Sequence, residues 1–257
     1  MANKKSKTVT EKQRPKNPMP AQHQKRPGIE AKMTPKPEYL APSYKSADKL
    51  EDKAALITGG DSGIGRAVAV LFAREGADSA IVFLPPEKVD AEETKRRVES
   101  EGQRCLLIAG DITKPAFCQS AVEKTVKEFG KLDILVNNAA YQHNQKSIED
   151  ISHEQFDKTF KTNIYGYFRM AKAALKHLKK GGAIINTGSI TGLEGSKDLL
   201  DYSSTKGAIH AFTKSLAQSL VEKGIRVNCV APGPVWTPLN VGTNPPKKSP
   251  NTGQIRR

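Results

Sequence analysis

The sequence predicts an α/β fold built on a doubly wound parallel sheet, and two observations lead to this prediction. From about residue 50, short apolar runs alternate with longer segments whose apolar residues have helical spacing. The runs are continuously apolar, as expected for strands of a parallel sheet that helices cover on both faces. We expect six strands, within residues 53–58, 79–84, 104–112, 133–140, 182–189 and 224–233.

Helices are expected in the segments between these strands. The first, RAVAVLFAREG over residues 66–76, has its apolar residues on one face and is stopped by Gly76. The second is DAEETKRRVESEG over residues 90–102. The remaining helices are expected at about 115–129, 153–178 and 203–223.

The chain of 257 residues is strongly basic, but its charge is concentrated at the two ends. Of the net charge of +14, residues 1–49 carry +8 and residues 240–257 carry +4, which leaves +2 for the residues between them. A nearly neutral body argues against a basic groove and a specific nucleic-acid partner. We expect a basic, Pro-rich, extended or disordered tail over 1–45, a folded domain over 46–239 and an irregular basic tail over 240–257.

Neither a membrane span nor a signal peptide can be recognised in the sequence. No run of about 18 apolar residues occurs, and the basic N-terminus has no apolar core. We therefore expect a cytoplasmic protein with no membrane partner. Three widely spaced cysteines, Cys105, Cys118 and Cys229, favour reduced thiols over disulfides or a metal site.

A glycine-rich loop, TGGDSGIG, lies between the first predicted strand and the first helix. Gly59, Gly63 and Gly65 allow the backbone to turn tightly and to approach a pyrophosphate at the positive N-terminus of the helix. Loops of this composition also occur as plain turns. Taken alone, the loop leaves a nucleotide site and a turn about equally open.

Tyr202 and Lys206 lie four residues apart near the start of a predicted helix and therefore share one helical face. A nearby ammonium favours the phenolate, so the pair suits proton transfer at the tyrosine oxygen. Lowering the pKa of a tyrosine from about 10 to neutrality would take about 4 kcal/mol. A solvated helix face explains the same spacing, and by itself the pair does not establish a site.

These features belong to an ordered set of motifs. In chain order the set consists of TGxxxGxG, NNAA (137–140), KTNIYG with Asn163, NTGSITG with Ser189, DYSSTKGA with Tyr202 and Lys206, and APGPVWT (231–237). As a set, the motifs resemble the short-chain dehydrogenase/reductase family over about residues 50–239. The segment PAQHQKRPGIEAKMTPKP is similar to the leader of a bacterial subgroup described as glucose/ribitol dehydrogenase-like or general stress oxidoreductases.

The resemblance implies a Rossmann-like, dinucleotide-binding catalytic domain. It makes Tyr202 the acid/base that exchanges a proton with the substrate oxygen, and Lys206 the residue that lowers the pKa of Tyr202 and bonds the nicotinamide ribose. Ser189 would hold the same substrate oxygen. Asn163 would position a water in a proton relay to Lys206.

The resemblance also implies a set of contacts with the cofactor. Asp111 and Ile112 correspond to residues at the adenine, and Asn138 and Ala139 to residues at the adjoining ribose. The full set is Gly59, Ser62, Gly63, Ile64, Gly65, Asp111, Ile112, Asn138, Ala139, Tyr202, Lys206, Pro232, Gly233, Val235 and Thr237. No metal ligand set is expected.

The cofactor is expected to be NADP or NAD. An acidic residue about 20 positions after the glycines normally binds the 2′-hydroxyl of NAD, but the second strand ends in Leu84 and Pro85. With no carboxylate before Glu87, and with Arg66 and Lys88 nearby in the sequence, the pattern slightly favours NADP. Gln142 and His143 follow the NNAA motif and are candidates to face the substrate, although a solvated loop explains them equally well.

The resemblance weakens at the end of the chain. After GPVWTPL, the lid, helix and seventh strand usual in the family cannot be recognised, so we expect a truncated domain with six strands, the sixth at an edge. A homo-oligomer is expected through the helices at 153–178 and 203–223.

Three functions are compatible with the sequence. The first is an oxidoreductase that transfers a hydride between NAD(P) and an alcohol or carbonyl substrate such as a sugar, polyol or aldehyde. The second is a truncated, non-catalytic dinucleotide-binding protein. The third and least supported is nucleic-acid binding through the basic tails.

Overall fold

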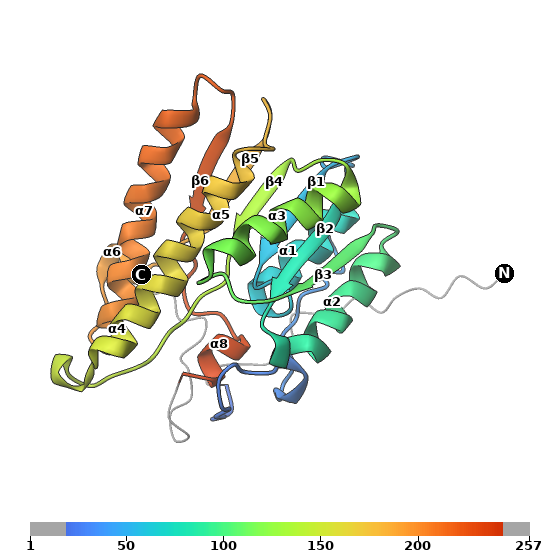
Figure 1. The fold of residues 1–257 in the computed structure, drawn as a ribbon. Coiled ribbons are helices and arrows are strands. Elements are labelled where there is room, and N and C mark those ends of the chain that lie inside the picture. The colour runs from blue at the N-terminus through green and yellow to red at the C-terminus, as the bar shows by residue number, and fades with distance from the viewer. Residues whose placement is uncertain (1–18, 244–257) are drawn as a thin grey trace.

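The computed structural model describes residues 19–243 and contains one six-stranded, all-parallel sheet (Figure 1). The strand order is β3-β2-β1-β4-β5-β6, which confirms the predicted doubly wound sheet. Residues 1–18 and 244–257 lie outside the described part, and with them most of the predicted tail at 240–257. The strands are β1 (Ala54–Thr58), β2 (Asp78–Phe83), β3 (Cys105–Ala109), β4 (Ile134–Asn137), β5 (Ala183–Thr187) and β6 (Arg226–Val230).

The centre of the sheet is the pair formed by β1 and β4, where the chain changes its direction of winding. Leu56 lies opposite Leu135, and both are fully buried. Strands β2 and β3 continue from β1 on one side, and β5 and β6 continue from β4 on the other. Loops that leave the carboxyl ends of β1 and β4 therefore diverge, and they form the crevice in which sheets of this kind bind ligands.

Two groups of helices cover the two faces of the sheet. Helices α1 (Gly63–Arg74) and α2 (Lys88–Ser100) pack on one face through small side chains such as Ala69 and Ala91. Helices α3 (Pro115–Phe129), α5 (Gly166–Ala174) and α7 (Leu200–Leu220) contribute to the core on the other face. Their apolar residues recur at helical spacing, as the sequence predicts.

The helix expected over 153–178 is interrupted in the structure. It consists of α4 (His153–Phe160), a π-helical turn (Lys161–Tyr165) and α5. The wider turn holds Asn163, which is fully buried and bonds to the loop after β4. Single π turns often occur at functional sites, and periodicity alone does not reveal them.

Several short elements complete the described chain. Helix α6 (Thr191–Glu194) and helix α8 (Pro238–Val241) lie near the carboxyl ends of the strands. Three 3-10 turns were not expected from the sequence, at Glu30–Lys32, Pro85–Glu87 and Ile148–Asp150.

Residues 19–45, which we call the N-terminal strap, begin at the carboxyl ends of the strands (Figure 1) and continue along the body to the C-terminal end of α1, where Arg74 donates to the carbonyl of Leu40 at 2.9 Å. The strap is attached through Glu30, whose side chain is only 3% exposed. The carboxylate of Glu30 accepts a hydrogen bond from the backbone N–H of Gly63 at 2.6 Å and pairs with Arg66. The carboxylate of Asp90 in turn accepts the backbone N–H of Glu30 at 2.6 Å.

A second attachment of the strap is apolar. Met33 packs with Trp236 and Val241 in a small buried cluster of its own. The indole N–H of Trp236 donates to the carbonyl of Pro35 at 2.7 Å. The strap therefore joins the start of α1 to the segment around α8, two parts of the chain that are far apart in sequence.

At the other end of the sheet order, β6 is an edge strand among the described residues, as predicted. Exposed Arg226, Asn228 and Val230 alternate along it with buried Val227. This pattern is typical of a strand with one covered and one open face.

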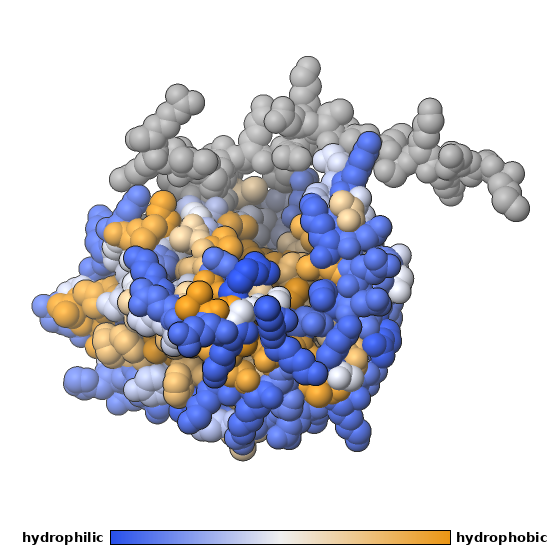
Figure 2. Space-filling model, turned by 90° about the horizontal axis from the view of Figure 1, so that it is seen from above, coloured by the Kyte–Doolittle hydropathy of each residue, from blue (hydrophilic) through white to orange (hydrophobic). Residues whose placement is uncertain are grey.

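The outer surfaces of α4, α5 and α7 carry exposed apolar side chains, including Phe156 and Phe168 on the first two helices. Figure 2 shows apolar residues on the side of the molecule where Figure 1 places these helices, whereas hydrophilic residues dominate most of the same view. This distribution agrees with the expected contact between copies of the chain, which stays a prediction.

Over residues 19–243, no helix is both long and apolar enough to cross a membrane, and no cluster of metal-ligating side chains occurs. Cys105, Cys118 and Cys229 are free thiols, and burial raises the pKa of each.

We predict that Arg66→Met will lower the free energy of unfolding by about 3–5 kcal/mol, because Glu30 and Asp90 would remain buried without their cation. The matched control is Arg104→Met. The ion pair of Arg104 with Asp78 lies at the surface, with the Arg104 side chain 58% exposed, and should contribute less than about 1 kcal/mol. Urea denaturation measures both. Equal losses in the two variants would contradict the structural role of the buried pair.

Candidate active site

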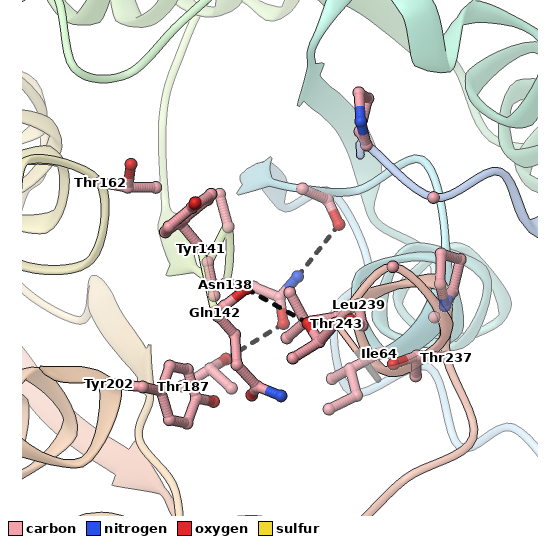
Figure 3. Close-up of a pocket in the computed structure, with 18 of the residues that line it drawn as sticks. Ile64, Asn138, Tyr141, Gln142, Thr162, Thr187, Tyr202, Thr237, Leu239 and Thr243 are labelled. Carbon is pink, nitrogen blue, oxygen red and sulfur yellow. Dashed lines mark hydrogen bonds between the residues drawn. The ribbon is translucent and has the colours of Figure 1, made fainter. Parts of the chain in front are cut away.

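A cavity of about 630 Å³ lies at the carboxyl ends of the strands. Its walls come from the glycine-rich loop, the loops after β2 to β6, the start of α7 and the strap. Figure 3 shows Tyr202, Gln142 and Asn138 on one side and Ile64 and Thr237 on the other. Nearly all residues that the sequence assigns to the site line this cavity; the exceptions are Gly65, Asn163 and His143, the last of which was a candidate to face the substrate.

The glycine-rich loop is held in shape by close backbone packing. A side chain at Gly65 would place its Cβ 1.9 Å from the carbonyl oxygen of Gly59, so only glycine fits there. Gly65 therefore packs against the start of the loop, and its expected contact with the cofactor stays a prediction. The side-chain amide of Asn138 donates to the carbonyl of Gly59 at 3.0 Å and fixes the loop to the end of β4.

Gly63 lines the cavity at the start of α1, where the sequence predicts an anion site. Its backbone N–H is already donated to the carboxylate of Glu30. The positive end of the helix thus stabilises a carboxylate of the strap. Any phosphate at this loop must use its other backbone donors, a feature that the motif alone does not reveal.

The other predicted cofactor residues have mixed surroundings. The carboxylate of Asp111 accepts hydrogen bonds from the backbone N–H and the hydroxyl of Thr113, at 2.8 and 2.7 Å. It therefore also holds the turn that precedes α3. Further cavity-lining residues at predicted positions are Ser62, Ile112, Ala139, Pro232, Gly233 and Val235.

Tyr202 and Lys206 lie on adjacent turns of α7 and both are buried. The ammonium of Lys206 donates to the carbonyl of Thr187 at 2.6 Å and lies 5.3 Å from the centre of the Tyr202 ring. Burial lowers the pKa of Lys206 to about 7. The predicted shared face is confirmed, and the shared environment is the cavity rather than solvent.

The pKa of Tyr202 is raised to about 12, because burial disfavours the phenolate more than a hydrogen bond with Ser189 favours it. The expected lowering of this pKa by Lys206 is therefore not present in the structure. The reason is that burial also favours the neutral form of Lys206, which leaves less positive charge beside the phenol.

Asn163 lies in the π turn with both ends of its amide engaged. Its oxygen accepts the backbone N–H of Tyr141 at 2.8 Å, and its nitrogen donates to the carbonyl of Tyr141 and the hydroxyl of Thr205, each at 3.0 Å. Through these hydrogen bonds, Asn163 holds the loop after β4 and the start of α7 together. The predicted relay through Asn163 stays a prediction.

The model of the short chain dehydrogenase family matches residues 53–248. The chain belongs to this family. The match extends past Leu239, where the sequence resemblance was expected to end.

General stress protein 39 of Bacillus subtilis is 60% identical to this short-chain dehydrogenase over 237 residues, which cover 92% of this chain and 82% of that protein. The glucose and ribitol dehydrogenase of Daucus carota is 48% identical over 225 residues, 86% of this chain and 77% of that protein. These similarities confirm the predicted subgroup.

Solved structures give the same result for the fold. A short-chain dehydrogenase from Burkholderia cenocepacia in complex with NADP is 34% identical, with a TM-score of 0.72 over 78% of this chain and 80% of that one. A short-chain dehydrogenase from Mycobacterium paratuberculosis bound to NAD is 33% identical, with a TM-score of 0.71 over 75% of this chain and 76% of that one.

Two acidic residues of this short-chain dehydrogenase line the cavity, and sequence analysis did not place either in the site. Asp61 lies within the glycine-rich loop, and Glu87 lies in the turn after β2. Burial raises the pKa of Asp61 to about 6 and that of Glu87 to about 8; the charge of Asp61 raises the pKa of Glu87 further, and the charge of Asp90 raises both. The Oδ2 atom of Asp61 is buried without a partner among the described residues, as expected of an acceptor for a bound ligand.

Arg66 was expected near a 2′-phosphate, and the structure corrects this. Its side chain is 4% exposed, and its guanidinium is occupied by Glu30, Thr94 and the carbonyls of Asp61 and Asp90. The side chain of Lys88 is 72% exposed and pairs with Glu92. Neither cation lines the cavity.

We predict a pH dependence of stability that Lys206 produces. Its pKa falls from 10.5 in the unfolded chain to about 7 in the folded protein. Between these values the unfolded chain binds more protons, so the contribution of Lys206 to stability rises with pH by up to about 1.4 kcal/mol per unit.

Urea denaturation at pH 7, 8 and 9 measures this slope. Relative to wild type, Lys206→Met should lose it, whereas Lys214→Met, at an exposed position of the same helix, should keep it. Parallel pH profiles for wild type and Lys206→Met would contradict the lowered pKa.

Proposed function

We propose that the protein is an NAD(P)-dependent oxidoreductase that interconverts an alcohol and a carbonyl compound, with Tyr202 as the acid/base. The observation that carries this proposal is the buried arrangement of Tyr202, Lys206 and Ser189 in one cavity with the glycine-rich loop. A sugar, polyol or aldehyde is the expected type of substrate, and the glucose and ribitol dehydrogenase relative supports it.

The residues present fit a dinucleotide. The cavity extends along the carboxyl ends of the strands, from the acidic residues beside β1 and β2 to Tyr202. At the acidic end, the Oδ2 atom of Asp61, which has no partner among the described residues, can accept a hydrogen bond. A bound nicotinamide would supply or accept the hydride. Lys206 and Tyr202 would hold its ribose, and Pro232, Gly233, Val235 and Thr237 would contact its nicotinamide end.

The protein's own contribution is to donate a proton from the phenol oxygen of Tyr202, or to accept one there. With a pKa of about 12, the phenol is neutral at physiological pH and can donate its proton to the oxygen of a carbonyl that becomes an alcohol. Ser189 lines the same space and orients that oxygen. Lys206, with a pKa of about 7, can exist in both protonation states and so can return a proton toward the phenolate.

We further propose that NAD is preferred to NADP, which replaces the slight preference for NADP inferred from sequence. The pKa values of Asp61 and Glu87 place a carboxylate and a largely protonated carboxyl group in the cavity near neutral pH. Such groups can bond ribose hydroxyls, whereas a 2′-phosphate would be repelled by the charge of Asp61. The two cations expected to attract that phosphate are engaged elsewhere.

We predict that Tyr202→Phe will lower kcat by about 10²- to 10⁴-fold, because the variant lacks the proton donor. NADH oxidation with a panel of aldehydes, sugars and their polyols measures the loss. Tyr165→Phe is the matched control, since Tyr165 is 46% exposed and outside the cavity. If wild type turns over no more than Tyr202→Phe while both bind NADH, the protein is a non-catalytic dinucleotide binder.

We predict that replacing both acids, Asp61→Asn with Glu87→Gln, will lower the preference for NADH over NADPH by about tenfold or more, equivalent to at least 1.4 kcal/mol. Fluorescence titration with each reduced cofactor gives the two Kd values. Glu92→Gln is the control, because Glu92 lies on α2 away from the cavity. Tighter binding of NADPH by wild type would refute the preference.

A further inference from the structure

The strap places the guanidinium of Arg26 at the cavity, although residue 26 lies outside the segment that the family model matches. Arg26, Pro27 and Gly28 all line the cavity. The Nη1 atom of Arg26 lies 2.8 Å from Nδ1 of His143 and donates to the hydroxyl of Tyr141 at 3.3 Å. The guanidinium also lies 5.3 Å from the centre of the Tyr141 ring. Arg26 thus joins the strap to the loop that follows β4.

The backbone around Arg26 is held on both sides. A Cβ at Gly28 would lie 2.5 Å from the carbonyl oxygen of Pro238, so the strap and α8 are in the closest contact that glycine allows. The backbone N–H of Gln24 donates to the carbonyl of Val241 at 3.0 Å. Glu30 is also bonded to the start of α1. Together these contacts hold the backbone of Arg26 in place, with its side chain directed to the cavity.

The surroundings of Arg26 are positively charged. No carboxylate of the described chain lies within 4.0 Å of its guanidinium, and its Nε atom is buried with no partner in the same residues. The ammonium of Lys158 lies 4.5 Å from the centre of the same Tyr141 ring, and it too has no ion pair within residues 19–243. Both cations lower the pKa of His143, in addition to the effect of burial.

The acidic residues of this region do not compensate these charges. Asp157 pairs with Lys161. Asp201 raises the pKa of His143, but its carboxylate accepts hydrogen bonds from Thr159 at 2.7 Å and Gln155 at 3.1 Å. Two cations that line a cavity without a counterion are suited to bind an anionic group.

This anion site belongs to the substrate end of the cavity. Tyr141 and His143 flank Gln142, and Gln142 lines the same cavity as Tyr202. The hydroxyl of Thr243 donates to the carbonyl of Gln142 at 3.2 Å, so the same loop also contacts the segment after α8. The two cofactor positions in this loop, Asn138 and Ala139, lie directly after β4, and Tyr141 to His143 lie further along it.

We propose that Arg26, with Lys158, binds a carboxylate or phosphate group of the substrate, carried at a carbon away from the one that reacts at Tyr202. The preferred substrates would then be anionic aldehydes or sugar phosphates rather than neutral ones. This inference rests on the proposed oxidoreductase function, because it places the anion relative to Tyr202.

The test compares matched neutral and anionic substrates at saturating NADH: butanal with 4-oxobutanoate, and glucose with glucose 6-phosphate in the oxidative direction with NAD. Wild type should favour the anionic member of at least one pair by about tenfold or more in kcat/KM. The carboxylate and phosphate pairs identify which anion is bound. Equal or better use of the neutral member in both pairs would overturn the proposal.

Variants assign the preference to Arg26. Arg26→Gln should remove it through a higher KM for the anionic substrate, while kcat/KM for the neutral one changes less than about twofold. Arg26→Lys should retain part of the preference, which a purely structural role would not explain. Lys25→Gln, at the adjacent exposed position, should behave as wild type. Equal losses on neutral and anionic substrates would show that Arg26 only supports the loop.

Binding measurements separate this proposal from the proposed function. Calorimetric titration with succinate and with inorganic phosphate should show at least one anion bound by wild type and about tenfold weaker by Arg26→Gln, whether or not turnover occurs. Such binding without turnover would leave the anion site standing and reject the oxidoreductase. A loss of NADH affinity in Arg26→Gln, with no change for succinate or phosphate, would assign the cation to the cofactor's pyrophosphate and overturn the proposal.

Discussion

The site depends on one buried cation, the guanidinium of Arg66. It pairs with Glu30 of the strap, donates to the carbonyl of Asp61 in the glycine-rich loop at 2.7 Å and to the carbonyl of Asp90 on α2 at 3.0 Å. A buried charge is costly unless its hydrogen bonds are completed, so the guanidinium stabilises the contact of these three segments. The strap is therefore part of the cofactor end of the molecule, because it supplies one of the counterions of the first helix.

The order of strands and helices could be predicted because it depends on local periodicity. Continuous apolar runs such as that of β1 indicate buried parallel strands, and the motifs at their carboxyl ends then fall on one edge of the sheet. The π turn at Asn163 and the buried position of the Glu30 side chain could not be predicted. Each is decided by contacts between residues at least 20 positions apart, namely Asn163 with Tyr141 and Glu30 with Arg66.

The chemistry of the site shows the same limit. The spacing of Tyr202 and Lys206 correctly predicts that they share a face, but the direction of the pKa shift of Tyr202 depends on how deeply α7 is buried. Desolvation disfavours the phenolate and the ammonium alike, so enclosing the pair raises the pKa of Tyr202 and lowers that of Lys206. Similarly, Arg66 is adjacent to the glycine motif in sequence, yet packing turns its guanidinium away from the cavity and leaves Asp61 and Glu87 to line it.

The cavity consequently has opposite electrical character at its two ends. Asp61 and Glu87 lie beside β1 and β2, whereas Arg26 and Lys158 lie around Tyr141, beyond the end of β4. Within a partly enclosed cavity such charges are screened less than in water, so they influence which end an anionic ligand occupies. If the substrate is anionic, as proposed, it would be repelled from the acidic end and attracted to the end that contains Tyr202. The family domain supplies the acids and Lys158, while the strap, held through Glu30, supplies Arg26 and so adds to this polarity.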